Sequence, residues 1–191
     1  NKAAAAFETA ISEAGIVPGD TEYDINYYLG SCYDKLGDYE AALKVYDAIV
    51  TLRPKDADAI ELRGAVKMQM GDTDGMQKDF SKAIALEPSN YDRLLSVYSA
   101  MSQNGYDTEG KVYLQNALDK YSDSMSSYDR GRIAYYVGDY ETARTNLEQM
   151  QSNTDEKVVL MLGRTYEALG DFNYATNVYK TFLSSDSMHP E

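Results

Sequence analysis

A glycine recurs at a nearly constant interval, and this period constrains the fold of the chain more than any other feature. The glycines are separated by 34, 34, 33 and 32 residues, and all but the third are followed directly by aspartate: Gly37, Gly71, Gly105, Gly138 and Gly170. A fixed period of this size indicates repeated supersecondary units, none of which buries its apolar face alone. The sequence therefore predicts a stack of similar units without a single enclosed pocket.

Other positions keep step with these glycines. Seven residues before them lie small residues, except Tyr98 in the third unit, and nine residues after them lie bulky ones such as Tyr46 and Phe80. Apolar residues recur at helical spacing, and no strand-like alternation of comparable length occurs. We therefore expect each unit to be two helices of about 12–15 residues, joined at the Gly-Asp turn.

The first unit contains the series Tyr27-Tyr28-Leu29-Gly30, Tyr33, Leu36-Gly37-Asp38-Tyr39, Ala42, Tyr46 and Pro54, and similar residues hold the same positions around Gly170. This series resembles the tetratricopeptide repeat, a pair of antiparallel helices about 34 residues long. In the middle units Arg63 and Lys67 stand where that family has apolar residues, and Gly110 replaces an alanine. The resemblance covers essentially the whole chain and implies an all-α, right-handed superhelical solenoid.

On this reading residues 1–191 form one domain of about five repeats. Residues 1–22 are expected to be a half-repeat, because Ala3, Phe7 and Ala10 keep the spacing of a second helix without its first. This segment either caps the stack or marks the cut end of a longer chain. The repeats are placed at 23–56, 57–90, 91–123, 124–155 and 156–189.

Composition limits the partners. The net charge of −13 and the pI near 4.5 disfavour nucleic acid and anionic membrane surfaces, both of which attract clustered Lys and Arg. No stretch of about 20 apolar residues predicts insertion into a membrane. One cysteine does not distinguish the cytoplasm from a bacterial exterior. Abundant Tyr, Ser, Asp and Asn favour a bacterial extracytoplasmic protein, a class that includes proteins anchored at the surface.

Catalytic chemistry finds little support. The only histidine, His189, lies in the expected tail, and Cys32 lies near the other end of the stack, so the two do not form a nucleophilic pair. An EF-hand loop beginning at Asp72 would place Ala83 where a bidentate glutamate is needed. We therefore predict that the chain is not an enzyme and that it has no cofactor and no metal site.

The resemblance implies that the first helix of each unit lines a concave groove that binds extended peptides or partner helices. The family's clamp for chaperone C-termini needs Lys, Asn and Arg, whereas the matching places hold Tyr27, Ser31 and Leu62, so a chaperone-tail adaptor is not predicted. Carrying the groove positions over gives Tyr27, Tyr28, Glu61, Leu62, Tyr128, Arg132, Tyr135, Tyr136 and Arg164.

The predicted groove is acidic at Asp34, Asp58 and Glu61 and basic at Arg132 and Arg164. Arginine and tyrosine are favoured at binding hot spots, so we expect an acidic group of a bound peptide near the two arginines. The alternative is that the tyrosines pack between neighbouring helices.

The leading hypothesis is a non-enzymatic scaffold or adaptor that binds a protein or peptide. Two alternatives remain: a peptide-sensing regulatory module, and an accessory domain of a larger surface or secreted enzyme. Self-association through the repeat ends is also open, because the last unit carries many apolar residues and no amphipathic helix follows it. These are Phe172, Tyr174, Val178, Tyr179, Phe182 and Leu183.

Overall fold

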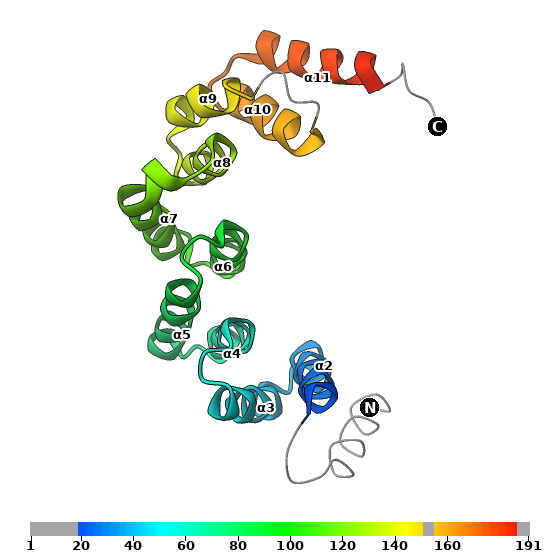
Figure 1. The fold of residues 1–191 in the computed structure, drawn as a ribbon, viewed down its shortest axis with the longest axis vertical. Helices are drawn as coiled ribbons and strands as arrows, with labels where there is room; N and C mark the ends of the chain where they lie inside the picture. The colour runs from blue at the N-terminus through cyan, green and yellow to red at the C-terminus, as the bar shows by residue number, and fades with distance from the viewer. Residues whose placement is uncertain (1–18, 151–154, 187–191) are drawn as a thin grey trace. The chain divides into compact units, whose positions relative to one another are not determined.

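The computed structural model describes residues 19–150 and 155–186, and these residues form α-helices joined by short turns, with no strand among them. Figure 1 labels the helices. They are α2 (Asp20–Leu36), α3 (Tyr39–Leu52), α4 (Ala57–Gln69), α5 (Thr73–Leu86), α6 (Tyr91–Gln103), α7 (Asp107–Tyr121), the short 3-10 helix η1 (Ser122–Ser124), α8 (Ser127–Val137), α9 (Tyr140–Glu148), α10 (Glu156–Ala168) and α11 (Phe172–Asp186).

The chain divides into two compact units, residues 1–93 and 94–191, with the boundary inside α6. The first unit contains the hairpins α2–α3 and α4–α5, and the second contains α8–α9 and α10–α11 as well as α7. Within each unit the first helices of the hairpins lie in one layer and the second helices in another (Figure 1). Most of the half-repeat expected over residues 1–22 lies outside the described residues.

Each hairpin turns at one of the periodic glycines, whose φ angles lie between 74° and 102° in the left-handed region. The residue after the glycine donates its backbone N–H to a carbonyl near the end of the first helix, for example Asp38 to Tyr33 at 3.0 Å. The carboxylates of Asp38, Asp72 and Asp139 then accept a backbone N–H and cap the second helix. One Gly-Asp pair thus ends one helix and begins the next, as the sequence predicts.

A second set of glycines brings the two helices of a hairpin close together. In four hairpins a glycine on the first helix faces a bulky side chain on the second, sixteen residues later in the sequence. A Cβ atom at the glycine would lie only 2.2–2.9 Å from an atom of that side chain. These pairs are Gly30 with Tyr46, Gly64 with Phe80, Gly131 with Leu147 and Gly163 with Tyr179.

The third hairpin has a different pair of close residues. Tyr98 on α6 occupies the place of the small residue, and Gly110 on α7 lies opposite it, where an added Cβ would be 3.1 Å from the tyrosine ring. The Tyr98 hydroxyl donates to Asp107 at 2.9 Å. The irregularity in the sequence is therefore compensated, because Gly110 stands where the first hairpin has Ala42 and leaves room for the Tyr98 ring.

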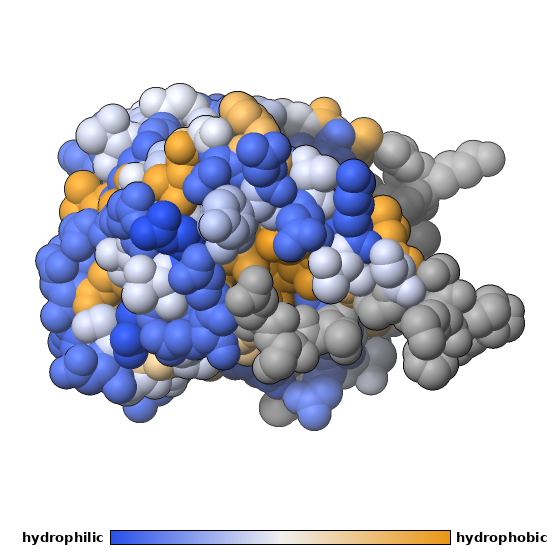
Figure 2. Space-filling model, turned by 90° about the horizontal axis from the view of Figure 1, so that it is seen from above, coloured by the Kyte–Doolittle hydropathy of each residue, from blue (hydrophilic) through white to orange (hydrophobic). Residues whose placement is uncertain are grey.

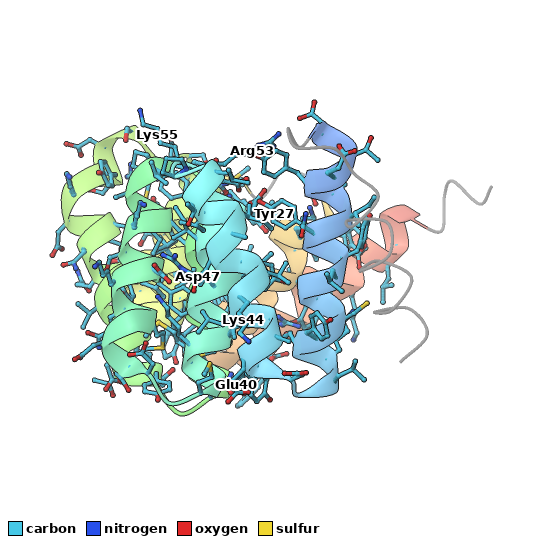
Figure 3. All side chains as sticks on the ribbon, turned by 90° about the horizontal axis from the view of Figure 1, so that it is seen from below. Tyr27, Glu40, Lys44, Asp47, Arg53 and Lys55 are labelled. Atoms are coloured by element: carbon cyan, nitrogen blue, oxygen red, sulfur yellow. The ribbon has the colours of Figure 1, made fainter. Side chains whose placement is uncertain are left out.

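A buried carboxylate holds the second hairpin together. Asp79 on α5 is 1% exposed, and its oxygens accept from Arg63 at 2.6 and 2.8 Å and from Lys67 at 2.7 Å. Arg63 also donates to Asp47 of α3, which Figure 3 labels, at 2.9 Å. Burial opposes the charge of Asp79, but these hydrogen bonds outweigh it and lower the pKa of the carboxyl. The two cations that depart from the family pattern thus neutralise a buried partner.

We predict that Gly30→Ala destabilises the chain. The new methyl would lie 2.7 Å from the buried ring of Tyr46, and such overpacking costs about 1–3 kcal/mol. Replacing glycine by alanine also raises helix propensity by about 1 kcal/mol, but the cost of overpacking equals or exceeds this gain, so the net change is a loss of stability. Urea denaturation should show a lower unfolding free energy, whereas Asp24→Ala, at an exposed position of the same helix, should change it by less than about 0.5 kcal/mol. A Gly30→Ala chain as stable as the wild type would contradict the steric argument.

We also predict that Asp79→Ala lowers the unfolding free energy by about 3–5 kcal/mol, because Arg63 and Lys67 lose their buried partner. The control Asp47→Ala removes an exposed partner of Arg63 and should cost no more than about 1 kcal/mol. Equal losses in the two variants would show that the buried carboxylate has no special part in stability.

The same pair of chains tests the pH dependence. Because folding lowers the pKa of Asp79, its contribution is complete above the unfolded value of about 4 and is lost as the pH falls through the folded value. The wild type should therefore lose stability more steeply than Asp79→Ala as the pH falls below about 4.

Candidate functional site

Three predicted groove tyrosines lie together on α8. Tyr128, Tyr135 and Tyr136 are half-buried and pack against a core cluster that includes Leu147 and Met161. Aromatic contacts extend from them. The ring centroids are 5.3 Å apart for Tyr135 and Tyr136, and 5.5 Å apart for both Tyr98–Tyr136 and Tyr135–Tyr140. Tyr98 and Tyr140 were not among the predicted site residues, although such rings present large, rigid contact areas.

Arg132 on α8 forms an ion pair with Asp129 of the same helix. Its Nε and Nη2 atoms donate to one oxygen of Asp129 at 3.0 and 2.7 Å, and its guanidinium carbon lies 5.1 Å from the ring centroid of Tyr128. The hydroxyl of Ser126 donates a hydrogen bond to the other oxygen of Asp129 at 2.6 Å. Only 15% of the Arg132 side chain is exposed. These contacts orient the Tyr128 ring and leave Arg132 less accessible than the sequence suggests.

Arg164 on α10 differs from Arg132. It is exposed, and it forms no ion pair with any residue in 19–150 or 155–186. Burial raises the pKa of Tyr135 and of Tyr179, while the positive charge of Arg164 acts in the opposite direction on both hydroxyls. The guanidinium therefore lies close enough to both tyrosines to influence them. Of the predicted basic pair, Arg164 is thus the exposed cation, and it lies beside aromatic side chains.

The predicted residues of the first unit have mixed surroundings. Tyr28 and Leu62 are exposed. Tyr27, shown in Figure 3, packs against the core of the unit, and its hydroxyl donates to Asp56 at 2.5 Å. Burial, followed by the effect of Asp56, raises the pKa of Tyr27. Because Asp56 also caps α4, Tyr27 joins the first hairpin to the second, and its hydroxyl is occupied.

Three acidic residues of the first unit surround a buried arginine. Arg93, at the start of α6, is 8% exposed and pairs with Glu61 at 2.5 Å, Asp58 at 2.7 Å and Glu87 at 3.0 Å. Burial opposes its charge, but the three carboxylates prevail and raise the pKa of Arg93. Sequence reasoning missed this residue. Its place about one period after Asp58 is the available signal, since successive first helices are neighbours in a repeat fold.

The part of the chain that the structure describes has no group of side chains that could hold a metal ion. No group of three or more His, Cys, Asp or Glu side chains there is arranged to hold a metal ion. Cys32 is half-buried and free of a disulfide, and His189 lies outside the described residues. None of the described helices is both long and apolar enough to cross a bilayer.

Comparisons with known proteins relate the chain to tetratricopeptide repeats. Two family models of the tetratricopeptide repeat match residues 1–57 and 57–90. No curated protein matches the sequence. Three similar solved structures share 13–20% of their residues with the chain, which at this level shows a common fold alone.

A tetratricopeptide repeat protein from Parabacteroides merdae is 15% identical, with a TM-score of 0.58 over 95% of this chain and 71% of that one. MamA from Desulfovibrio magneticus is 13% identical, with a TM-score of 0.52 over 92% of this chain and all of that one. A thermophilic repeat protein of Thermus thermophilus is 20% identical, with a TM-score of 0.50 over 85% and 90% of the two chains. The predicted all-α solenoid of helix pairs is confirmed.

Repeat folds of this kind present extended surfaces to their partners. Residues 1–90 match tetratricopeptide repeats, and the described chain has the fold of tetratricopeptide repeat structures, which supports a protein-interaction scaffold in general.

Proposed function

We propose that the chain is a non-enzymatic adaptor that binds an extended or helical segment of a protein on the α8–α10 face. This face comprises Tyr128, Arg132, Tyr135 and Tyr136 on α8 and Arg164 on α10. The observation that carries the proposal is the exposed Arg164, without an ion pair among the described residues, next to half-buried tyrosines. An uncompensated guanidinium beside aromatic rings suits a ligand that is both acidic and apolar.

The two arginines have separate parts in this proposal. Arg164 pairs with a carboxylate of the ligand, whereas Arg132 supports the Tyr128 ring through its bonds to Asp129. The tyrosines supply contact area at a low entropic cost, because each has few rotatable bonds. The remaining predicted groove residues in the first unit, Tyr28 and Leu62, are exposed and extend the candidate surface on that unit.

Selection of twelve-residue peptides from a random library against the intact chain tests this proposal. We predict that the selected peptides are rich in Asp or Glu and that Arg164→Ala weakens their affinity about tenfold, the loss of a charge-assisted hydrogen bond. Arg164→Glu should weaken them further, and added salt should weaken binding to the wild type. Arg144→Ala is the matched control, since Arg144 lies on the second helix α9 and pairs with Glu141 at 2.5 Å.

Unchanged affinity in both Arg164 variants would contradict the assignment of the basic anchor. Circular dichroism should show that Arg164→Ala keeps its helix content, because the side chain is exposed.

A further inference from the structure

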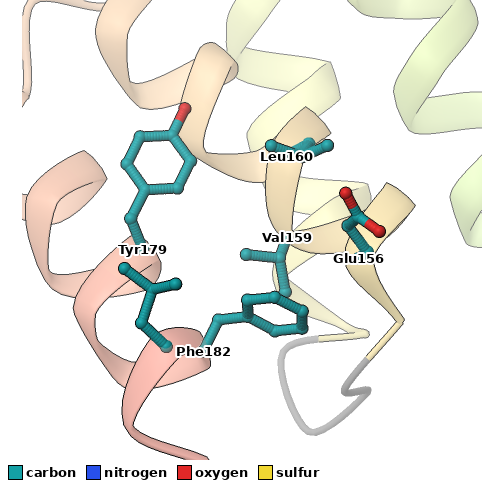
Figure 4. Close-up of a pocket in the computed structure, with 6 residues that line it drawn as sticks. Glu156, Val159, Leu160, Tyr179 and Phe182 are labelled. Carbon is teal, nitrogen blue, oxygen red and sulfur yellow. The ribbon is translucent and has the colours of Figure 1, made fainter. Parts of the chain in front are cut away.

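An apolar pocket of about 290 Å³ lies between α10 and α11, and Figure 4 shows Val159, Tyr179 and Phe182 among its lining. Figure 2 looks down on the end that carries α11 in Figure 1, and apolar surface is visible there among polar side chains. In the first hairpin the counterparts of this lining, Tyr46 and Ile49, pack with the following helix of the same chain, α4. The pocket by itself therefore indicates no second protein.

A different apolar pair is exposed in the first unit. Tyr28 on α2 and Leu62 on α4 are counterparts, since each lies two residues before a close-contact glycine, Gly30 or Gly64. The tyrosine is 63% exposed and the leucine 37%. Both stand at positions that the repeat assigns to the groove, and tyrosine is a favoured residue at binding hot spots.

The exposure of this pair does not depend on where a stack of repeats ends. The helix α4 has a first helix on each side of it. The Tyr27 hydroxyl of α2 donates to its cap, Asp56, at 2.5 Å, and Arg93 of α6 pairs with its Glu61 at 2.5 Å. Leu62 is exposed even with both neighbours in place. Adjacent repeats therefore leave this position open.

Carboxylates lie one turn before both members of the pair. Asp24 on α2 is exposed and forms no ion pair with a residue that the structure describes. Asp58, its counterpart on α4, pairs with Arg93, but two further carboxylates share that guanidinium. Three carboxylates on one cation leave an excess of negative charge. We call Asp24, Tyr28, Asp58 and Leu62 the α2–α4 face.

The cations of these two helices do not cancel this charge. Arg63 and Lys67, the basic residues of α4, are both bound to the buried carboxylate of Asp79. Lys35, the only basic residue of α2, lies two turns beyond the tyrosine of the face. The exposed apolar pair therefore has a negative surrounding, in a chain with 31 Asp and Glu against 18 Lys and Arg.

The same helix shows what a neighbouring tyrosine and aspartate hold. The guanidinium carbon of Arg53, labelled in Figure 3, lies 3.4 Å from the ring centroid of Tyr23, and the side chain donates to Asp20 at 2.7 Å. This ring and this carboxylate are one turn apart on α2, as Tyr28 and Asp24 are. The ring face attracts the cation and the carboxylate pairs with it, so the combination suits a guanidinium.

We infer that the α2–α4 face binds an arginine-containing segment of another protein. The guanidinium lies on the Tyr28 ring and pairs with Asp24, and an apolar neighbour of that arginine packs on Leu62. The net charge of −13 attracts a basic segment and makes a second copy of this chain a poor occupant. The inference rests on the proposal that the chain binds protein segments, and it adds a basic class of ligand to the acidic class of the α8–α10 face.

A blocked nine-residue peptide in which Arg-Leu pairs alternate with serine is the probe. Titration into the isotope-labelled intact chain should shift the amide signals of Tyr28 and Leu62. Asp24→Ala should weaken binding about two- to fivefold, the loss of an exposed ion pair. Tyr28→Ala should weaken it about five- to tenfold, because the ring supplies both cation attraction and contact area. Asp74→Ala and Tyr174→Ala, at exposed positions of α5 and α11, are the matched controls and should bind as the wild type does.

The double variant Asp24→Ala/Tyr28→Ala tests whether both groups hold one guanidinium. Its loss of affinity should be smaller than the product of the two single losses, because the effects of residues that share a partner are not additive. Both side chains are exposed, so circular dichroism should show unchanged helix content. Losses that multiply would contradict the shared guanidinium.

Three further results would overturn the inference. The first is the absence of any shift at either amide at millimolar peptide. The second is equal binding by a peptide with glutamate in place of each arginine. The third is self-association of the chain in sedimentation velocity that Tyr28→Ala abolishes, because the occupant would then be a second copy.

The two faces can fail separately. Arg164→Ala should leave binding of the Arg-Leu peptide unchanged, and a loss in that variant alone would assign the peptide to the α8–α10 face. The acidic peptides that test the α8–α10 face should in turn bind Tyr28→Ala as they bind the wild type.

Discussion

The close contact between a glycine on one helix and a bulky side chain on the next is the constraint on which the fold depends. It sets the distance between the two helices of a hairpin, because a Cβ atom at Gly163 would lie 2.2 Å from Tyr179. With the helices this close, apolar side chains from both helices pack together in the core of each unit. The third hairpin meets the same constraint with a different pair, in which Gly110 leaves room for Tyr98. What is retained in every hairpin is the pairing of one large with one small residue.

Several departures from the repeat pattern prove to be compensated within the fold. Arg63 and Lys67 stand at positions that the family fills with apolar side chains, and together they neutralise the buried carboxylate of Asp79. In the same way, Arg93 pairs with the carboxylates of Asp58 and Glu61 on α4 and of Glu87 at the end of α5. Burying a charge is costly unless its partners are present. Asp79 therefore requires Arg63 and Lys67, and Arg93 requires its own carboxylates. Irregular positions in a repeat are therefore as informative about packing as about partners.

The sequence predicted which residues make up the candidate site better than it predicted their contacts. The groove positions of the family led to the tyrosines of α8 and to both Arg132 and Arg164. The structure separates the two arginines, since Asp129 binds Arg132 at 2.7 Å while Arg164 is exposed. Sequence spacing shows which residues share a helix face, but it does not show which neighbour a long, flexible side chain reaches. Two arginines at corresponding positions thus have different surroundings: Arg132 is bound to Asp129, whereas Arg164 is exposed.

The sequence by itself determined the period, the helix pairs, the Gly-Asp turns and the acidic character of the chain. These depend on local physics: φ angles that glycine adopts readily, aspartate caps and apolar residues at helical spacing, all within a few residues of one another. Only the tertiary structure decided that Tyr27 is tied to Asp56, that Arg93 is buried among carboxylates and that Tyr98 compensates Gly110. Each of these depends on side chains from different helices, whose approach follows from packing and not from the local sequence.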